Sequence, residues 1–72
     1  MEKILKKLGA NIKSARKKQG MTLLDLAVKT GFDDSNLAKI EKGQIDIGIV
    51  KLVQIAMALN VELNELYSIK ES

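Results

Sequence analysis

The side chains of this 72-residue chain that could do chemistry are twelve basic groups, nine carboxylates and some hydroxyls and amides. There is no cysteine and no histidine, so a thiolate nucleophile, an imidazole general base and the ligands of a zinc finger are missing. The carboxylates are scattered through the sequence, and so short a chain leaves little room for a cleft that encloses a substrate. We therefore expect no enzyme, no metal site and no cofactor.

The basic side chains are concentrated at the start of the chain. Residues 1–18 hold seven of them against Glu2, a net charge of +6, whereas residues 19–43 and 44–72 carry −1 and −2. Such a cluster attracts phosphate polymers or an anionic membrane, and a solvated surface is the alternative. The first residues are too charged for a secretory signal, and no apolar run reaches the ~20 residues of a membrane span. We expect a soluble, cytoplasmic protein.

Apolar residues recur at the 3.6-residue period of amphipathic helices over most of the chain. The stripe of the first predicted helix, which ends near Gly20, consists of Ile4, Leu5, Leu8, Ile12 and Ala15. Gly9 lies inside this helix at a cost of about 1 kcal/mol relative to alanine. We therefore expect another helix to pack closely against Gly9.

The next two predicted helices are short and have recognisable ends. Thr22 and Asp25 form a capping-box pattern that opens a helix of about two turns, which Gly31 can end in the left-handed conformation. Asp33 can then cap a third helix, and Gly43 can end it in the same manner.

The apolar run over residues 49–59 is too continuous for a one-sided surface helix. It predicts a central, mostly buried fourth helix that Asn60 can end, and a short fifth helix follows over residues 63–67. Alternating isoleucines over residues 45–49 resemble a strand, but a single strand would have no partner. The sequence therefore predicts an all-α fold, a compact five-helix bundle in which residues 1–72 form one domain.

The segment from about residue 23 to residue 42 has the spacing of a helix-turn-helix. Two helices that cross at a wide angle need a small residue where they touch, Ala27, and a residue that tolerates positive φ in the turn, Gly31. Leu37 and Ile40 supply the apolar anchors of the second helix.

Across residues 8–67 the chain resembles the Cro and phage-repressor type of helix-turn-helix regulators, also called the XRE family. The positions that carry the resemblance are Leu8, Gly9, Ile12, Arg16, Gly20, Met21, Thr22, Leu26, Ala27, Gly31, Ile40, Glu41, Lys42, Gly43, Leu52, Ile55, Ala56, Ala58, Leu59, Val61 and Leu66. So many matched positions make the combined pattern specific. The resemblance implies a lambda repressor-like domain whose third helix enters the major groove of DNA.

Carried over position by position, the resemblance implies base contacts by Asp34, Ser35, Asn36, Ala38 and Lys39. Lys39 can donate to guanine, and Ser35 can donate or accept. Ala38 can touch a thymine methyl, and Asp34 can accept from cytosine N4. Exposed helix residues without a DNA role are the alternative.

Other polar residues around this helix are candidate phosphate contacts: Lys13, Lys17, Lys18, Thr22, Lys42 and Gln44. Among the departures from the family pattern, two bear on phosphate binding. Leu23 stands where family members commonly carry a phosphate-binding glutamine. The acids Asp33 and Asp34 face a polyanion and lower non-specific affinity.

Arg16 is the only arginine among the twelve basic residues. A planar guanidinium suits two parallel hydrogen bonds to a carboxylate. The resemblance pairs it with Glu41 at the end of the recognition helix, as a structural ion pair rather than a DNA contact.

The sequence also favours a homodimer, because the estimated apolar burial of a lone chain, worth about 105 kcal/mol, barely matches about 108 kcal/mol of ordering. Apolar residues in excess of the predicted core are candidates for the interface, although the core could absorb several of them: Ile45, Ile47, Ile49, Leu63, Tyr67 and Ile69.

The main functional hypothesis is a sequence-specific regulator of transcription, a repressor that binds double-stranded DNA as a homodimer. The alternative is a protein-interaction module of the antitoxin type, in which the acidic third helix meets a protein partner. Binding to a membrane is disfavoured because the apolar stripe of the first helix is needed for the core.

Overall fold

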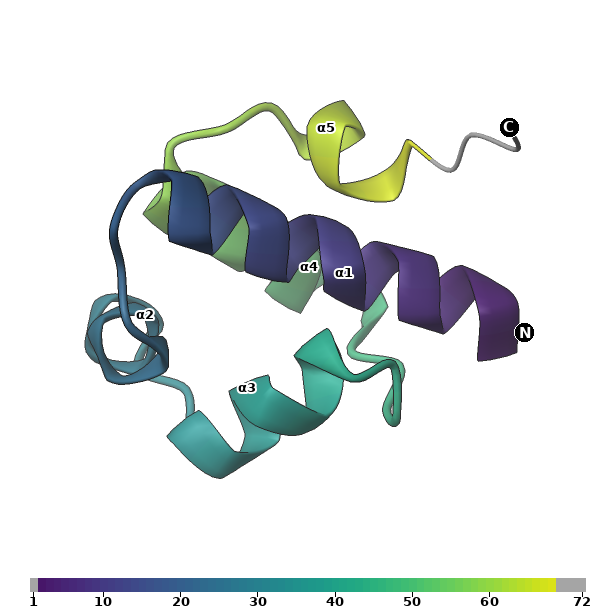
Figure 1. Cartoon of the computed structure of the whole chain (residues 1–72), viewed down its shortest axis with the longest axis horizontal. Helices are drawn as coiled ribbons and strands as arrows, with labels where there is room; N and C mark the ends of the chain where they lie inside the picture. The colour runs from purple at the N-terminus through teal and green to yellow at the C-terminus, as the bar shows by residue number, and fades with distance from the viewer. Residues whose placement is uncertain (1, 69–72) are drawn as a thin grey trace.

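The computed structural model describes residues 2–68, which form five α-helices and no strand (Figure 1). The predicted all-α class is confirmed. The helices are α1 (Glu2–Lys18), α2 (Leu23–Thr30), α3 (Asp34–Glu41), α4 (Gly48–Leu59) and α5 (Leu63–Tyr67).

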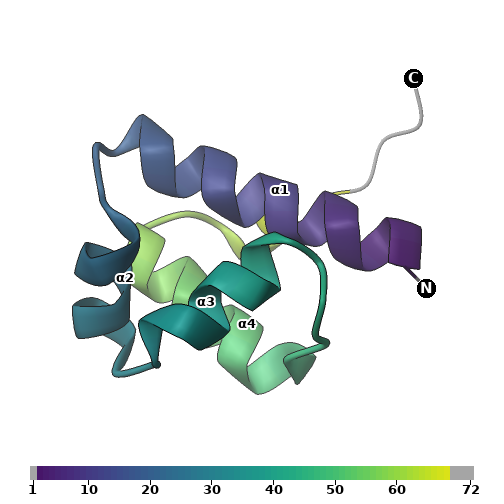
Figure 2. The same cartoon turned by 60° about the horizontal axis from the view of Figure 1, so that its bottom comes forward.

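The long helix α1 runs the length of the molecule, with α4 behind it and with α3 and α5 on opposite sides (Figure 1). The short helix α2 packs against α3 and α4 at one end of the bundle. Turning the molecule brings α3 to the front, with its outer side free of other helices (Figure 2). The inner side of α3 therefore packs against the other helices, and its outer side is open to solvent.

Every helix contributes to one apolar core. The fully buried side chains are Ile12 of α1, Leu26 of α2, Leu37 of α3, Ile55 and Leu59 of α4, and Leu66 of α5. Burying a side chain of this size stabilises the fold by about 1.5–3 kcal/mol. Because the five helices share this core, the position of α3 depends on all the others.

The predicted ends of α2 are confirmed. The Thr22 hydroxyl accepts a hydrogen bond from the Asp25 backbone N–H (3.0 Å), and the Asp25 carboxylate accepts one from the Thr22 N–H (2.8 Å). Gly31 follows the helix in the left-handed conformation with φ 77°. The prediction that the Asp33 side chain caps α3 through a hydrogen bond is wrong. Asp33 occupies the N-cap position, but its carboxylate accepts from the Ser35 hydroxyl (2.9 Å), which competes successfully with the helix backbone.

The prediction that the fourth helix is mostly buried is also wrong. One side of α4 packs into the core, but Ile49, Val50, Val53 and Met57 are exposed, Val50 to 71%. The reason is the small number of helices, since α1, α2 and α5 cover only one side of α4. Ile4 likewise remains 54% exposed, because the first turn of α1 extends beyond the neighbouring helices (Figures 1 and 2).

The backbone of α1 closely approaches the end of α3. A Cβ atom at Gly9 would lie 2.5 Å from the carbonyl oxygen of Glu41, and one at Gly43 would lie 2.6 Å from the Cα of Lys6. Gly43 also has φ 74° and lets the Gln44 N–H close the helix on the Lys39 carbonyl (2.9 Å). The close packing expected at Gly9 is therefore present, and its partner is the end of α3.

This contact predicts different costs for two glycines of similar φ. Gly43→Ala should lower the free energy of unfolding by about 2–5 kcal/mol, because the methyl group adds overpacking against α1 to the left-handed strain. Gly20→Ala is the matched control, since φ there is 68° and no atom lies within 4 Å of the added carbon. It should cost only about 1–2 kcal/mol. Urea unfolding measures both, and equal costs would contradict a tight α1–α3 contact.

Candidate nucleic-acid interface

The α2–turn–α3 unit holds α3 at a fixed angle. Ala27 is buried where the two helices meet, and its carbonyl accepts from the Gly31 N–H in the turn (2.8 Å). Leu37 and Ile40 anchor α3 from its inner side. The small residue, the left-handed turn and the two anchors therefore take the places that a helix-turn-helix requires.

The outer side of α3 carries most of the predicted base-contact residues. Asp34, Ser35, Asn36 and Lys39 are exposed, whereas Ala38 is half-buried. Ala38 therefore offers only part of its methyl group to a ligand. The exposed set presents an ammonium, a carboxylate, an amide and a hydroxyl, which together can donate to and accept from base edges.

The Ser35 hydroxyl has a defined orientation in this structure. Its proton is used in the hydrogen bond to Asp33, so its lone pairs are the groups left for a ligand. In this state Ser35 can accept a hydrogen bond from an amino group of adenine or cytosine but cannot donate to guanine.

Arg16 and Glu41 form the contact that joins α1 to the end of α3. The guanidinium donates to both carboxylate oxygens, from Nε at 2.7 Å and from Nη2 at 3.0 Å. Its third bond, from Nη1, goes to the carbonyl of Met21 before α2 (2.8 Å). Arg16 is only 9% exposed. One side chain thus links α1, the α1–α2 turn and α3.

Two ionisable groups near this unit have shifted pKa values. The hydrogen bonds to Glu41 raise the pKa of Arg16 against the opposing effect of burial, so the guanidinium stays charged. The backbone and hydroxyl hydrogen bonds with Thr22 lower the pKa of Asp25. Asp25 is therefore ionised at neutral pH and keeps the start of α2 capped.

The candidate phosphate contacts lie around α3 with one exception. Lys13, Lys17, Lys42 and Gln44 are exposed, and the exposed Thr22 accepts the Asp25 N–H while its hydroxyl proton stays available. Lys18 instead lines a cleft of about 400 Å³ between α1 and α5, on the side of α1 away from α3.

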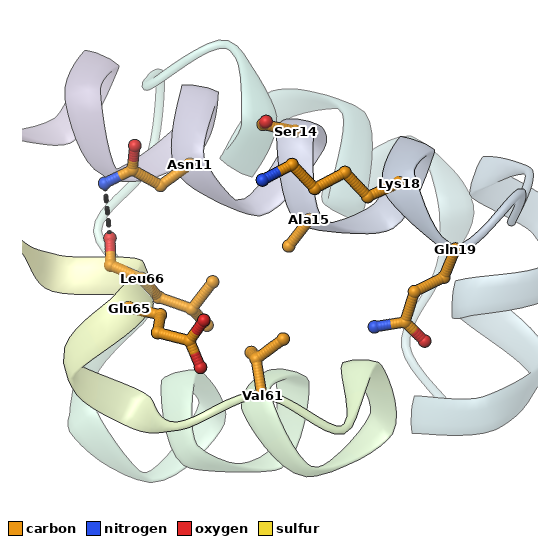
Figure 3. Close-up of a pocket in the computed structure, with 8 residues that line it drawn as sticks. All are labelled: Asn11, Ser14, Ala15, Lys18, Gln19, Val61, Glu65 and Leu66. Atoms are coloured by element: carbon orange, nitrogen blue, oxygen red, sulfur yellow. Dashed lines mark hydrogen bonds between the residues drawn. The ribbon is translucent and has the colours of Figure 1, made fainter.

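Figure 3 shows this cleft, with Lys18 on the α1 side and Glu65 on the α5 side. Asn11 closes one end through a hydrogen bond to the Leu66 carbonyl (2.8 Å), and Gln19 donates to the Leu59 carbonyl. The cleft is therefore separate from the outer side of α3.

The candidate interface residues divide into two groups. Ile47 and Leu63 are half-buried and pack against the core, which absorbs them. Ile45, Ile49 and Tyr67 are exposed, and Ile69 lies outside the described residues. Sequence reasoning missed further exposed apolar residues, namely Val50, Val53 and Met57 of α4 and Leu24 and Val28 of α2. Their helical spacing was visible, but which side of each helix is covered depends on tertiary packing.

Leu23 replaces the phosphate-binding glutamine of the family pattern, and its side chain is half-buried against the core. The position therefore contributes to packing and has no polar group for a phosphate. Within residues 2–68, no group of three acidic side chains is placed to hold a metal ion, and no helix is long and apolar enough to cross a membrane.

Residues 9–71 match the family described as "Helix-turn-helix domain". The chain belongs to the helix-turn-helix family of transcriptional regulators. Its resemblance to the Cro and phage-repressor type is thereby confirmed, and DNA-binding regulation is the activity of this family.

Two relatives come from Sinorhizobium fredii (strain NBRC 101917 / NGR234). The chain is 33% identical over 52 residues to the HTH-type transcriptional regulator y4dL, covering 72% of this chain but only 26% of that protein. It is 30% identical over 61 residues to the HTH-type transcriptional regulator y4dJ, covering 85% of this chain and 79% of the relative. The chain thus spans about a quarter of the length of y4dL and most of y4dJ.

Two solved structures are similar to this helix-turn-helix chain. One is the restriction-modification controller protein C.AhdI from Aeromonas hydrophila, with a TM-score of 0.84 and 32% identity over 88% of this chain and 96% of the other. The second is the clp gene regulator ClgR from C. glutamicum, with a TM-score of 0.84 and 25% identity over 88% and 82%.

The Arg16–Glu41 contact predicts a graded loss of stability. Arg16→Lys keeps the charge but loses the forked bond and the bond to Met21, so we expect the free energy of unfolding to fall by about 1–3 kcal/mol. Arg16→Met leaves a nearly buried carboxylate unpaired and should cost about 3–5 kcal/mol. Chemical denaturation measures both changes. If the free energy of unfolding of Arg16→Lys equals that of the wild type, the two parallel hydrogen bonds from Arg16 to Glu41 contribute nothing to stability.

Proposed function

We propose that this chain is a sequence-specific transcriptional repressor that binds operator DNA as a homodimer, with α3 in the major groove. Residues 1–72 then form one helix-turn-helix domain with its core over residues 8–67. The observation that carries the proposal is the outer side of α3, where Asp34, Ser35 and Lys39 are exposed on a helix held by the Arg16–Glu41 contact and the core.

Base recognition in this proposal follows from the orientation of each group. Lys39 donates to guanine O6 or N7, and Asp34 accepts from cytosine N4. Ser35 accepts from an amino group, because its own proton is held by Asp33. Asn36 contacts a base or the nearby backbone, and the half-buried Ala38 touches the edge of a thymine methyl.

Phosphate binding in this proposal comes from both sides of α3. Lys13 and Lys17 of α1 approach the backbone on one side, and Lys42 and Gln44 after α3 approach it on the other. Thr22 offers its hydroxyl proton at the start of α2. We assign Lys18 to a different surface, because it lies over the cleft toward α5.

The homodimer in this proposal uses the exposed apolar side of α4 together with Ile45 and Tyr67. Ile49, Val53 and Met57 follow one another at helical spacing, and burying them against a second copy would remove them from water. Two recognition helices on one duplex require half-sites about 34 Å apart. Bound at a promoter, such a dimer would block access to the DNA.

An antitoxin-type interaction module is the second candidate, favoured by the apolar side of α2. Leu24 and Val28 are 62% and 76% exposed beside Asp33 and Asp34, which suits a protein partner better than a phosphate backbone. A gel-shift assay on DNA upstream of the gene distinguishes the two candidates. A regulator making several phosphate contacts should lose orders of magnitude in affinity between about 50 and 200 mM salt.

The assignment of Lys39 predicts a specificity defect without a folding defect. Operator fragments would first be recovered by sequencing the genomic DNA that the protein retains. Lys39→Ala should weaken binding to them by about 5–150-fold, equivalent to about 1–3 kcal/mol, and relax the preference at one base pair. Lys29→Ala is the control, because it removes the same charge from α2. Equal losses for the two variants would show that Lys39 reads no base.

The proposed interface predicts that Val53→Asp is monomeric. A carboxylate placed within the apolar side of α4 would have to be desolvated on association, so the dimer should dissociate while the helix content stays unchanged. Gln54→Asp is the control, because it adds a carboxylate at the neighbouring exposed position of the same helix. Analytical ultracentrifugation measures both, and a dimeric Val53→Asp would place the interface elsewhere.

A further inference from the structure

The most strongly charged surface of the molecule is only partly used by the proposed function. Six lysines lie on the solvent-facing arc of α1 between its contacts with α3 and with α5, which we call the outward face of α1: Lys3, Lys6, Lys7, Lys13, Lys17 and Lys18. All six are exposed, and none forms an ion pair within residues 2–68, where Arg16–Glu41 is the single pair.

The six lysines form two rows. Residues advance by about 100° around a helix, so Lys6, Lys13 and Lys17 lie within about 80° of Gly9, which faces α3. By the same geometry, Lys3, Lys7 and Lys18 lie within about 80° of Asn11, which bonds to the end of α5. A duplex seated on α3 is within reach of the first row only, because α3 and α5 are on opposite sides of α1 (Figure 1).

We propose that the second row, Lys3, Lys7 and Lys18, which we call the α5 row, binds the phosphate backbone of a second nucleic-acid duplex, separate from the duplex that α3 contacts. The row extends about 22 Å from Lys3 to Lys18, a length over which a duplex carries about 13 phosphates. Between the lysines stand Ala10 and Ser14, whose small side chains leave an open surface that a backbone can approach closely.

The same features favour a duplex over a membrane. Interfacial helices insert a row of large apolar side chains into lipid, but most of the apolar stripe of α1 packs on the core, with Ile12 fully buried and Leu8 packed against it, and the exposed Ile4 alone is not such a row. A carboxylate near the α5 row is that of Glu65, across the cleft from Lys18 (Figure 3). A chain with two such faces can hold two segments of DNA together.

A titration of isotope-labelled protein with a 16-base-pair duplex of arbitrary sequence at low salt tests this proposal by NMR. Amide signals of α3 should shift with the first equivalent, and signals of Lys3 and Lys7 should shift with the second. The variant Lys3→Gln/Lys7→Gln should lose the second phase, because two of the three lysines of that row are removed. The control Lys29→Gln/Lys51→Gln removes two charges elsewhere and should keep both phases.

Four results would overturn the proposal. The first three are Lys3 and Lys7 signals that shift together with those of α3 and saturate at one equivalent, Lys3 and Lys7 signals that never shift, and a double variant that keeps the second phase. Preferential binding of Lys3 and Lys7 to phosphatidylserine vesicles over the duplex would also overturn it. If α1 shifts and α3 does not, this inference stands and the proposed operator contact fails, so the two are distinguishable.

Discussion

Within the described part of the chain, the Glu41 carboxylate has one partner, the guanidinium of Arg16, and both side chains are nearly buried between α1 and the end of α3. The two backbones approach so closely beside this pair that neither Gly9 nor Gly43 has room for a Cβ atom. The angle of α3 is therefore determined by polar bonds and by steric contact together. A recognition helix needs such support, because side chains can read base edges only from a backbone held in place.

Much of this arrangement could be predicted from the sequence, because the signals are local. The Thr22–Asp25 capping box and Gly31 define α2 through contacts a few residues apart, and the apolar period defines α1. The prediction of a buried α4 was wrong for a nonlocal reason. Periodicity shows which side chains are apolar, but only the positions of the other helices decide which side of α4 is covered. The Asp33 bond was also missed, because Ser35 competes for the same carboxylate.

Charge is distributed unevenly over the proposed nucleic-acid surfaces. At the start of α3, Asp33 and Asp34 repel phosphates, while the acceptors Asp34 and Ser35 and the cation Lys39 are available for base edges. The lysines of α1 supply attraction that is independent of sequence. The acids of α3 therefore weaken its binding to phosphates of any sequence, and the lysines of α1 supply most of that binding. Discrimination between DNA sites then depends on the few side chains of α3 that reach base edges. Leu23 also lowers phosphate binding near α3, because it packs on the core at the position where family members commonly have a phosphate-binding glutamine.

The most direct test of the central claim is a crystal structure of the chain with an operator fragment recovered from its own genome. The account predicts that α3 lies in the major groove, with Lys39 within hydrogen-bond distance of a guanine and Ser35 accepting from an amino group, while the Arg16–Glu41 bonds remain intact. A complex in which α3 faces solvent or a protein, with DNA held only by α1, would contradict it.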